Sequence, residues 1–242
     1  MVEKIARISG IDEHSNVIEV GPGIGALTEQ LALKAKTVTA FEIDPRCIDV
    51  LSETMADYPN VKVVLQDFLS VKETDLPEGN LILCANLPYY VTTPILFHII
   101  EELPRITSFT IMVQKEVADR FVAKPSTKDY NALSIIVQTL FEVKTVMNVS
   151  KAVFLPRPSV DSAVVRFIRK PILPIEYPDR FFKLVKLSFT QRRKTLANNL
   201  KEISDTQTIQ AKLTQAGLDL NVRAEALSLI DFYRLYEVWY VH

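Results

Sequence analysis

The sequence predicts an α/β protein with a mostly parallel seven-stranded sheet flanked by helices, followed by a small all-helical domain. Two observations support this. From Asn16 onwards, short apolar runs alternate with amphipathic stretches, which is the order typical of β-α-β units. Beyond Asp179 the apolar residues recur only at helical spacing. We therefore divide the chain into residues 1–172, a catalytic domain in our interpretation, and residues 173–242, the helical domain.

The expected strands are short runs rich in apolar and β-branched residues, at 17–20, 38–41, 61–65, 81–85, 109–113, 144–149 and 162–168. Helices are expected within residues 1–15 and at about 25–33, 45–55, 94–103, from 115 onwards and at 131–141. Pro45 suits the first turn of a helix. Pro171, Pro174 and Pro178 interrupt both patterns and are expected to form the linker between the two domains.

Composition excludes several classes of protein. With 242 residues, 48% of them hydrophobic, the chain can bury a sizeable core. It contains no apolar run near the ~20 residues of a membrane span and no signal-peptide pattern. Cys47 and Cys84 have no partner spacing and the three histidines are scattered, so we expect no disulfide and no metal site. A reducing, cytoplasmic location fits this usage.

A glycine-rich turn, Gly21-Pro22-Gly23-Ile24-Gly25, follows the first expected strand and precedes a helix. Glycines at this point let the backbone approach a ligand closely. Glu42 lies 21 positions after Gly21, at the tip of the second strand, where a carboxylate can bind both ribose hydroxyls of a nucleotide. Asp44 competes for this role, but we expect it to cap the helix that Pro45 begins.

Asp67 ends the third expected strand, and its carboxylate could accept a hydrogen bond from an adenine amino group, with Phe68 beside the ring. These features fit any adenosine cofactor. The spacing alone leaves the choice between S-adenosyl-L-methionine and a nicotinamide dinucleotide open.

Asn86-Leu87-Pro88-Tyr89 follows the fourth expected strand. The Asn86 side-chain oxygen and a backbone carbonyl beside Pro88 can both accept hydrogen bonds from one amino group, and Tyr89 offers a face for a flat base. The alternative interpretation of these four residues is a strand end, a proline turn and an ordinary core tyrosine. Methyl transfer to an amine requires such paired acceptors and hydride transfer does not, so this stretch favours S-adenosyl-L-methionine.

Together these motifs resemble the class I S-adenosylmethionine methyltransferases that act on adenine N6 and have a Rossmann-like fold. Glu19, Gly21, Gly23 and Gly25 match the first motif, Glu42 the second, Asp67 the third and residues 86–89 the fourth. Three further stretches, 151–162, 191–200 and 223–228, resemble signatures of the small-subunit (16S-type) rRNA adenine N6,N6-dimethyltransferase family (KsgA type). The similarity extends over essentially the whole chain.

The resemblance implies dimethylation of two adjacent adenines in the 3′-terminal hairpin loop of small-subunit rRNA, linked to rRNA processing and ribosome biogenesis. It implies that Gly21, Glu42, Asp67 and Asn86 contact the cofactor and that Phe154 faces Tyr89 across the target base. The partner would be the immature small ribosomal subunit, and we expect a monomer. Three alternatives are a large-subunit rRNA methyltransferase of the antibiotic-resistance type, a non-catalytic RNA-binding assembly factor and a nicotinamide dehydrogenase.

The distribution of charge supports RNA binding. Residues 151–201 contain twelve basic and three acidic residues, a net charge of +9, whereas the whole chain carries −1. A phosphate-binding face requires such segregation. We assign RNA contact to Arg157 and to the group Arg192, Arg193 and Lys194; a solvated helical surface is the alternative for any single residue.

One feature departs from the family. Its members carry a basic leader with a Gly-Gln-Asn/His-Phe-Leu motif upstream of the glycine turn, and nothing in this sequence matches it. We expect that a truncated or lost leader would leave cofactor and target base more open to water and would slow the reaction.

Overall fold

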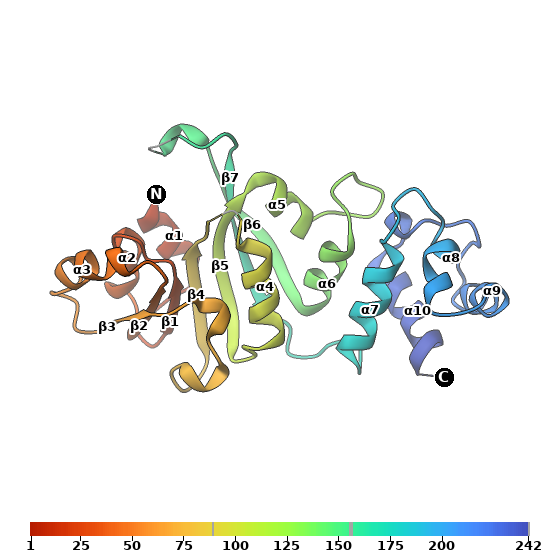
Figure 1. The fold of residues 1–242 in the computed structure, drawn as a ribbon, viewed down its shortest axis with the longest axis horizontal. Helices are drawn as coiled ribbons and strands as arrows, with labels where there is room; N and C mark the ends of the chain where they lie inside the picture. Colours follow the sequence, from red (N-terminus) through yellow and green to blue (C-terminus); the bar gives the residue numbers. More distant parts are fainter. Residues whose placement is uncertain (89, 155–156, 242) are drawn as a thin grey trace. The chain divides into compact units, whose positions relative to one another are not determined.

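In the computed structural model, which describes residues 1–88, 90–154 and 157–241, a seven-stranded sheet is followed by a set of C-terminal helices (Figure 1). The strand order is β3-β2-β1-β4-β5-β7-β6. The β1–β2, β1–β4, β2–β3 and β4–β5 pairs are parallel and the β5–β7 pair is antiparallel, so the sheet is mostly parallel, as predicted. The strands are β1 Asn16–Val20, β2 Thr37–Glu42, β3 Val61–Leu65, β4 Leu81–Asn86, β5 Ile106–Gln114, β6 Phe141–Val149 and β7 Ser162–Arg169.

All seven expected strands are present, and the bounds differ most in β5. This strand begins at Ile106 rather than at residue 109, because Ile106 and Ser108 pair with β4 although the local sequence is partly polar. Asn86 is the last residue of β4 and not, as expected, the first residue after it. The carboxyl end of β4 therefore presents this exposed side chain directly.

The helices that accompany the strands are α1 Val2–Ile8, α2 Ala26–Ala32, α3 Pro45–Thr54, α4 Thr92–Glu101, α5 Lys115–Phe121 and α6 Ala132–Leu140. α1 is shorter than expected and is followed by Gly10 at a φ of 77°. α4 begins two residues before Pro94, and the missing N–H of this proline falls in the first turn, where it would have no partner within the helix.

The chain divides into two compact units, residues 1–118 with 144–169 and residues 119–143 with 170–242. The second unit contains α6, most of the loop before it, and the helices α7 Pro178–Ser188, α8 Leu196–Asn199, α9 Thr206–Gln215 and α10 Leu229–Tyr240. Pro178 was expected in the linker, but it is the first residue of α7, where its fixed φ is compatible with the helix. The division into domains at residue 172 stays a prediction.

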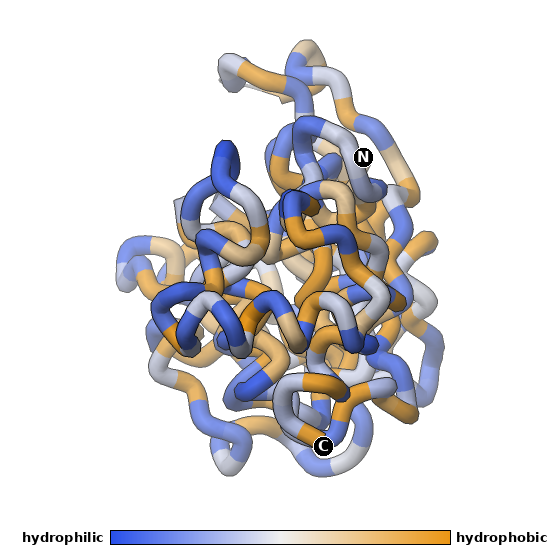
Figure 2. Tube along the Cα trace, turned by 90° about the vertical axis from the view of Figure 1, so that its right-hand side faces the viewer, coloured by the Kyte–Doolittle hydropathy of each residue, from blue (hydrophilic) through white to orange (hydrophobic). Residues whose placement is uncertain are grey.

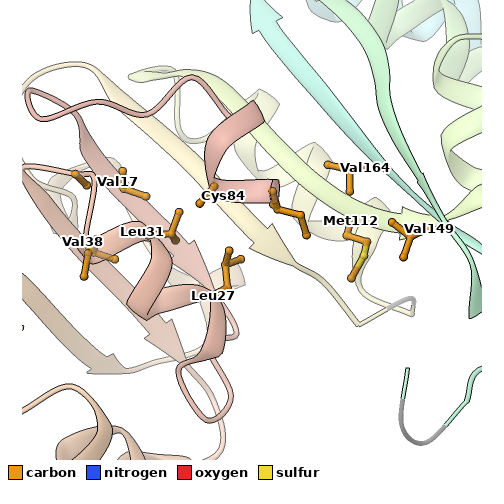
Figure 3. Close-up of a cluster of buried hydrophobic side chains, with 12 residues drawn as sticks. Val17, Leu27, Leu31, Val38, Cys84, Met112, Val149 and Val164 are labelled. Atoms are coloured by element: carbon orange, nitrogen blue, oxygen red, sulfur yellow. The ribbon is translucent and has the colours of Figure 1, made fainter. Parts of the chain in front are cut away.

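The core of the first unit includes a cluster that joins two helices to one face of the sheet (Figure 3). Ile5 of α1 and Leu27 and Leu31 of α2 pack with Val17 and Cys84 of the central strands. Burial of these side chains fixes the start of α2, and with it the turn that connects β1 to α2.

The second unit has its own core, formed by apolar residues on one side of each helix, such as Phe181 of α7 and Phe232 of α10. The hydropathy trace alternates between polar and apolar positions along these C-terminal helices (Figure 2). The buried Tyr130 donates a hydrogen bond of 2.7 Å to the carbonyl of Leu227, joining the loop before α6 to the segment before α10. Over the described residues, no helix has the length and apolar character needed to cross a membrane.

Candidate active site

The glycine turn lies at the carboxyl end of β1 and has three left-handed glycines, with φ of 68° at Gly21, 60° at Gly23 and 92° at Gly25. A Cβ atom at Gly25 would lie 2.8 Å from Cε of Met55 and 3.2 Å from Oγ1 of Thr54, so a side chain there would require these neighbours to shift in addition to adopting a left-handed backbone. A Cβ at Gly21 or Gly23 would meet no atom within 4 Å. The first two glycines therefore combine a backbone that favours glycine with an open face that a ligand can approach.

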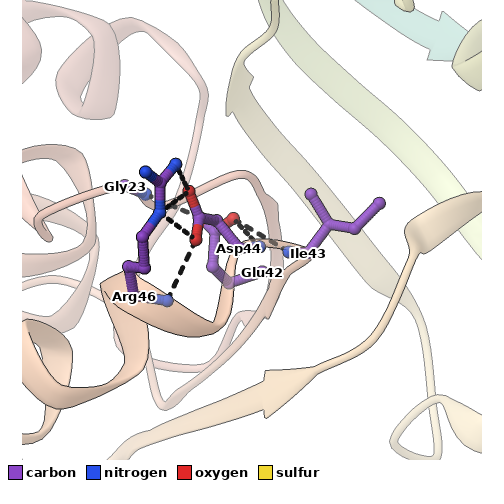
Figure 4. Close-up of polar contacts among 5 residues, drawn as sticks. All are labelled: Gly23, Glu42, Ile43, Asp44 and Arg46. Atoms are coloured by element: carbon purple, nitrogen blue, oxygen red, sulfur yellow. Dashed lines mark hydrogen bonds and ion pairs between the residues drawn. The ribbon is translucent and has the colours of Figure 1, made fainter.

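Glu42 is buried at the end of β2, and its carboxylate accepts three backbone hydrogen bonds (Figure 4). Oε2 accepts from the N–H of Gly23 at 3.0 Å, and Oε1 accepts from the N–H groups of Ile43 and Asp44 at 2.8 Å each. A carboxylate can accept about four hydrogen bonds, so roughly one acceptor position, on Oε2, remains for a ligand. The ligand role expected for Glu42 stays a prediction, and sequence reasoning missed that this carboxylate also fastens the glycine turn to β2.

Asp44 caps α3, as predicted, by accepting a hydrogen bond of 2.9 Å from the N–H of Arg46. The Arg46 guanidinium also pairs with this carboxylate at 2.6 Å. The hydrogen bonds from Arg46 lower the pKa of Asp44 to about 2. Both carboxylates of the Glu-Ile-Asp segment are thus engaged, Glu42 inside the turn and Asp44 at the helix N-terminus.

Glu19 lies inside the protein in β1, one residue before Val20. Burial raises the pKa of its carboxyl to about 8, and the nearby charge of Glu42 acts in the same direction. Its Oε2 atom has no hydrogen-bond partner among the described residues, and neither has Oγ1 of the buried Thr28 in α2. A buried carboxyl oxygen without a hydrogen-bond partner costs free energy, and a ligand that supplies a donor beside the glycine turn would recover part of that cost.

Asp67 is exposed two residues after the end of β3. Its Oδ1 accepts a hydrogen bond of 2.9 Å from the N–H of Leu69 and so caps a short 3-10 turn, Phe68–Ser70. Phe68 is only 4% exposed. Its ring packs edge-on against Phe41 and His98, with centroid distances of 5.7 Å in both pairs. The ring is therefore part of the core under the turn, and its expected place beside an adenine stays a prediction.

The Asn86 side chain is exposed at the carboxyl end of β4, beside the corresponding end of β1. Leu87 is buried, so that only its backbone can take part in chemistry. The Pro88 carbonyl accepts a hydrogen bond of 3.2 Å from the N–H of Val91, which leads directly into α4. Tyr89 lies outside the described residues, so its predicted stacking on a base and its predicted position opposite Phe154 are not described.

The segment between β6 and β7 carries Phe154 and Arg157. Its base is closed by two hydrogen bonds of Lys151, from its N–H to the Asp161 carboxylate at 2.9 Å and from its Nζ to the Ser159 carbonyl at 3.0 Å. Phe154 is half-buried and packs against the cluster around α1 and α2, and Arg157 is exposed. Leu155 and Pro156 lie outside the described residues.

In the second unit, the predicted RNA-binding residues form an exposed turn between α7 and α8. Arg192 donates a hydrogen bond of 2.8 Å to the Glu225 carboxylate, and Arg193 and Lys194 are exposed. Asn199 holds the turn from inside, since its Nδ2 donates to the carbonyls of Ser188 and Gln191. The structure thus joins two of the sequence signatures, 191–200 and 223–228, through one ion pair.

The carboxyl ends of β1, β2, β3 and β4 lie at one edge of the sheet, so Glu19, the glycine turn, Glu42, Asp67 and Asn86 share that edge. Two residues missed by sequence reasoning belong to it: Ile24 in the turn and Ile43 after Glu42 are 67% and 64% exposed. The sequence contained a signal for Ile43, since it stands between two acidic residues, Glu42 and Asp44, at the end of a strand. Among the described residues, no cluster of three or more His, Cys, Asp or Glu side chains could hold a metal ion.

Comparisons with known proteins agree with this arrangement. The family model of ribosomal RNA adenine dimethylase matches residues 1–240. Proteins named ribosomal RNA small subunit methyltransferase A from Bacillus mycoides and Bacillus thuringiensis are 45% identical over 255 aligned residues, covering 100% of this chain and 87% of each relative.

Two solved structures are similar over nearly the full length. A dimethyladenosine transferase from Plasmodium falciparum has a TM-score of 0.84 and 26% identity, with 97% of this chain and 93% of that chain covered. The 23S rRNA methyltransferase ErmE has a TM-score of 0.77 and 30% identity, with 98% and 96% covered. The Rossmann-like methyltransferase fold expected from the motifs is confirmed, and the chain belongs to the ribosomal RNA adenine dimethylase family.

Proposed function

We propose that this protein transfers methyl groups from S-adenosyl-L-methionine to N6 of two adjacent adenines in the 3′-terminal hairpin loop of small-subunit rRNA. The main support for this proposal is that the open glycine turn, the buried Glu19 and the exposed acceptor Asn86 lie at one edge of the sheet. The names of the 45% identical relatives support the small subunit as the source of the substrate.

The residues of the edge fit S-adenosylmethionine. This cofactor carries a net positive charge, and the unsatisfied carboxyl oxygen of Glu19 would lie beside a cation. Gly21 and Gly23 would let its chain pass close to the backbone, and Gly25 would complete the turn by packing closely against Met55. The remaining acceptor position on Glu42 would take a ribose hydroxyl, and Asp67, with Phe68 beneath it, would accept from the adenine amine. When bound, the cofactor supplies a methyl group already activated on its sulfonium sulfur.

The chain itself would prepare the target amine. Adenine N6 is a weak nucleophile because its lone pair is delocalised into the ring. The Asn86 oxygen and a backbone carbonyl of Leu87 or Pro88 would accept both N6 hydrogens and hold the lone pair toward the methyl group. The same acceptors favour the positive charge that develops on N6. Tyr89 and Phe154 would stack on the base, offsetting part of the cost of taking it out of the RNA stack.

RNA would be held mainly through its phosphates. Arg157 in the first unit and Arg192, Arg193 and Lys194 in the second are exposed cations in the strongly basic part of the chain. Such contacts position the substrate and carry no sequence information. We further propose that residues 173–242 act as an rRNA-binding domain and that the protein works as a monomer in the cytoplasm on an immature small subunit.

A large-subunit rRNA is the alternative substrate, since the structurally similar ErmE is a 23S rRNA methyltransferase. Transfer of labelled methyl groups to immature small subunits and, separately, to large-subunit rRNA distinguishes the two. We expect label in the small subunit alone, in two methyl groups per modified adenine, and none with an Asn86→Ala variant. Label only in the large subunit would reject the proposed substrate, and no binding of S-adenosylmethionine in calorimetry would reject the proposed cofactor.

A further inference from the structure

His98 lies in α4, 31 residues after Asp67 in the sequence, yet it contacts the turn that carries Asp67. Its Nε2 lies 2.9 Å from the carbonyl oxygen of Val71, the residue that ends the short turn after Asp67. A carbonyl can only accept, so the ring must donate through Nε2. The bond is thus available to both the neutral and the protonated ring, because Nε2 carries a hydrogen in each.

The same ring belongs to a row of three aromatic side chains. The edge of His98 meets Phe68 at an interplanar angle of 83°, and Phe68 meets Phe41 at 63°, with centroid distances of 5.7 Å in both pairs. Phe41 directly precedes Glu42 and Phe68 directly follows Asp67. The row therefore fixes the two acidic residues of the cofactor edge against one helix.

That helix begins where the base-recognition loop ends. The N–H of Val91 bonds to the Pro88 carbonyl, and the Val91 carbonyl accepts the first hydrogen bond of α4 from Ile95. From Thr92 to His98 the helix rises about 9 Å, at roughly 1.5 Å per residue. A rigid element thus connects Asn86 to the Asp67 turn over a short distance.

We propose that His98 is a positioning residue that holds the Asp67 turn in place for the cofactor adenine and couples this turn, through α4, to the loop that receives the target base. This rests on the proposed function. His98 touches neither reactant; it acts through the Val71 carbonyl and Phe68. Without the hydrogen bond from His98 to the Val71 carbonyl, the Asp67 turn should be held only by the hydrogen bonds within the turn and should be less ordered.

The test separates the hydrogen bond from the ring. His98→Phe keeps an aromatic ring and removes the donor, whereas His98→Gln keeps a donor and removes the ring. Calorimetry with S-adenosylmethionine should show roughly 3- to 10-fold weaker binding for His98→Phe, the value of one neutral hydrogen bond, and a smaller loss for His98→Gln. In methyl transfer, KM for the cofactor should rise more than kcat falls.

His14, whose side chain is 84% exposed, provides the matched control, and His14→Phe should bind like the wild type. Thermal unfolding of each variant checks that the fold is intact. Equal affinity of wild type and His98→Phe, or an equal loss in both His98 variants, would overturn the positioning role. A wild-type protein that does not bind S-adenosylmethionine would instead overturn the proposed function.

Discussion

The glycine turn and the Asn86 loop lie at the same edge of the sheet but are built in opposite ways. In the first, Glu42 is buried and its carboxylate already accepts three backbone hydrogen bonds. In the second, Asn86 is exposed, and the hydrogen bond from Val91 to the Pro88 carbonyl closes the loop. Glu42 on the cofactor side is therefore part of the folded core, whereas Asn86 on the base side has a side chain open to solvent. Substitutions on the cofactor side should change both stability and function; those on the base side should change function alone.

The largest effect is expected for Asn86→Ala. The variant loses one of the two acceptors for adenine N6, and methyl transfer should fall by about 100-fold or more, the cost typical of removing one positioned transition-state hydrogen bond. Because the side chain is exposed, the free energy of unfolding should change by no more than about 0.5 kcal/mol. Single-turnover kinetics and urea unfolding measure the two quantities. More than about a tenth of the wild-type rate would contradict an acceptor role.

Glu42→Ala tests whether a residue on the cofactor side affects both stability and cofactor binding. The variant leaves the N–H groups of Gly23, Ile43 and Asp44 without their acceptor, so the free energy of unfolding should fall by about 2–4 kcal/mol. Affinity for S-adenosylmethionine should fall by the roughly 1.5–3 kcal/mol of a hydrogen bond to a charged group.

Asp44→Ala is the matched control, since this partly exposed carboxylate caps α3 and pairs with Arg46. It should lower helix stability and leave cofactor affinity within about twofold, a change below 0.5 kcal/mol. If Asp44→Ala weakens cofactor binding and Glu42→Ala does not, Asp44 and not Glu42 is the residue that contacts the cofactor.

The sequence identified the strands, their carboxyl ends and the polar residues on them, because period-two and continuous apolar runs depend on local order. It also predicted correctly that Asp44 caps a helix, since a following proline is a local signal. What it missed depends on neighbours that are distant in the sequence. The hydrogen bond between Glu42 and Gly23 spans 19 residues, and the contact of His98 with Val71 spans 27.

Burial of a site residue is equally hard to foresee. Phe68 follows a strand, and nothing in the local sequence shows that its ring packs in the core between Phe41 and His98. Whether an aromatic residue at a strand end turns inward depends on which helix covers the sheet there. In the first unit α4 covers Phe68 through His98, and the sequence around Phe68 does not indicate which helix lies there.

The basic turn in the second unit resembles Asn86 in one respect, since the side chains of Arg192, Arg193 and Lys194 are exposed. Replacing Arg192, Arg193 and Lys194 together with Ala should weaken rRNA binding and lower the magnitude of its salt slope by about 0.7–0.9 for each lost phosphate contact. Methyl transfer to saturating rRNA and cofactor affinity should be retained. Binding titrations between 50 and 200 mM salt, about the range over which such contacts weaken, measure the slope. An unchanged slope with reduced thermal stability would make the turn structural, held by the ion pair between Arg192 and Glu225.

The last prediction concerns Glu19 and depends on pH. Burial raises the pKa of this carboxyl from 4.5 to about 8, so the folded state holds the proton more tightly than the unfolded chain does. Stability should therefore fall as the pH rises from about 4.5 and level off above about 8, by at most about 1.4 kcal/mol per pH unit. Glu19→Gln cannot ionise, and its advantage over the wild type in urea unfolding should grow between pH 5 and pH 8. Glu13→Gln, which alters an exposed carboxyl, should follow the wild type throughout. Curves for wild type and Glu19→Gln that stay parallel over this range would mean that Glu19 is ionised in the folded protein even without a cationic ligand.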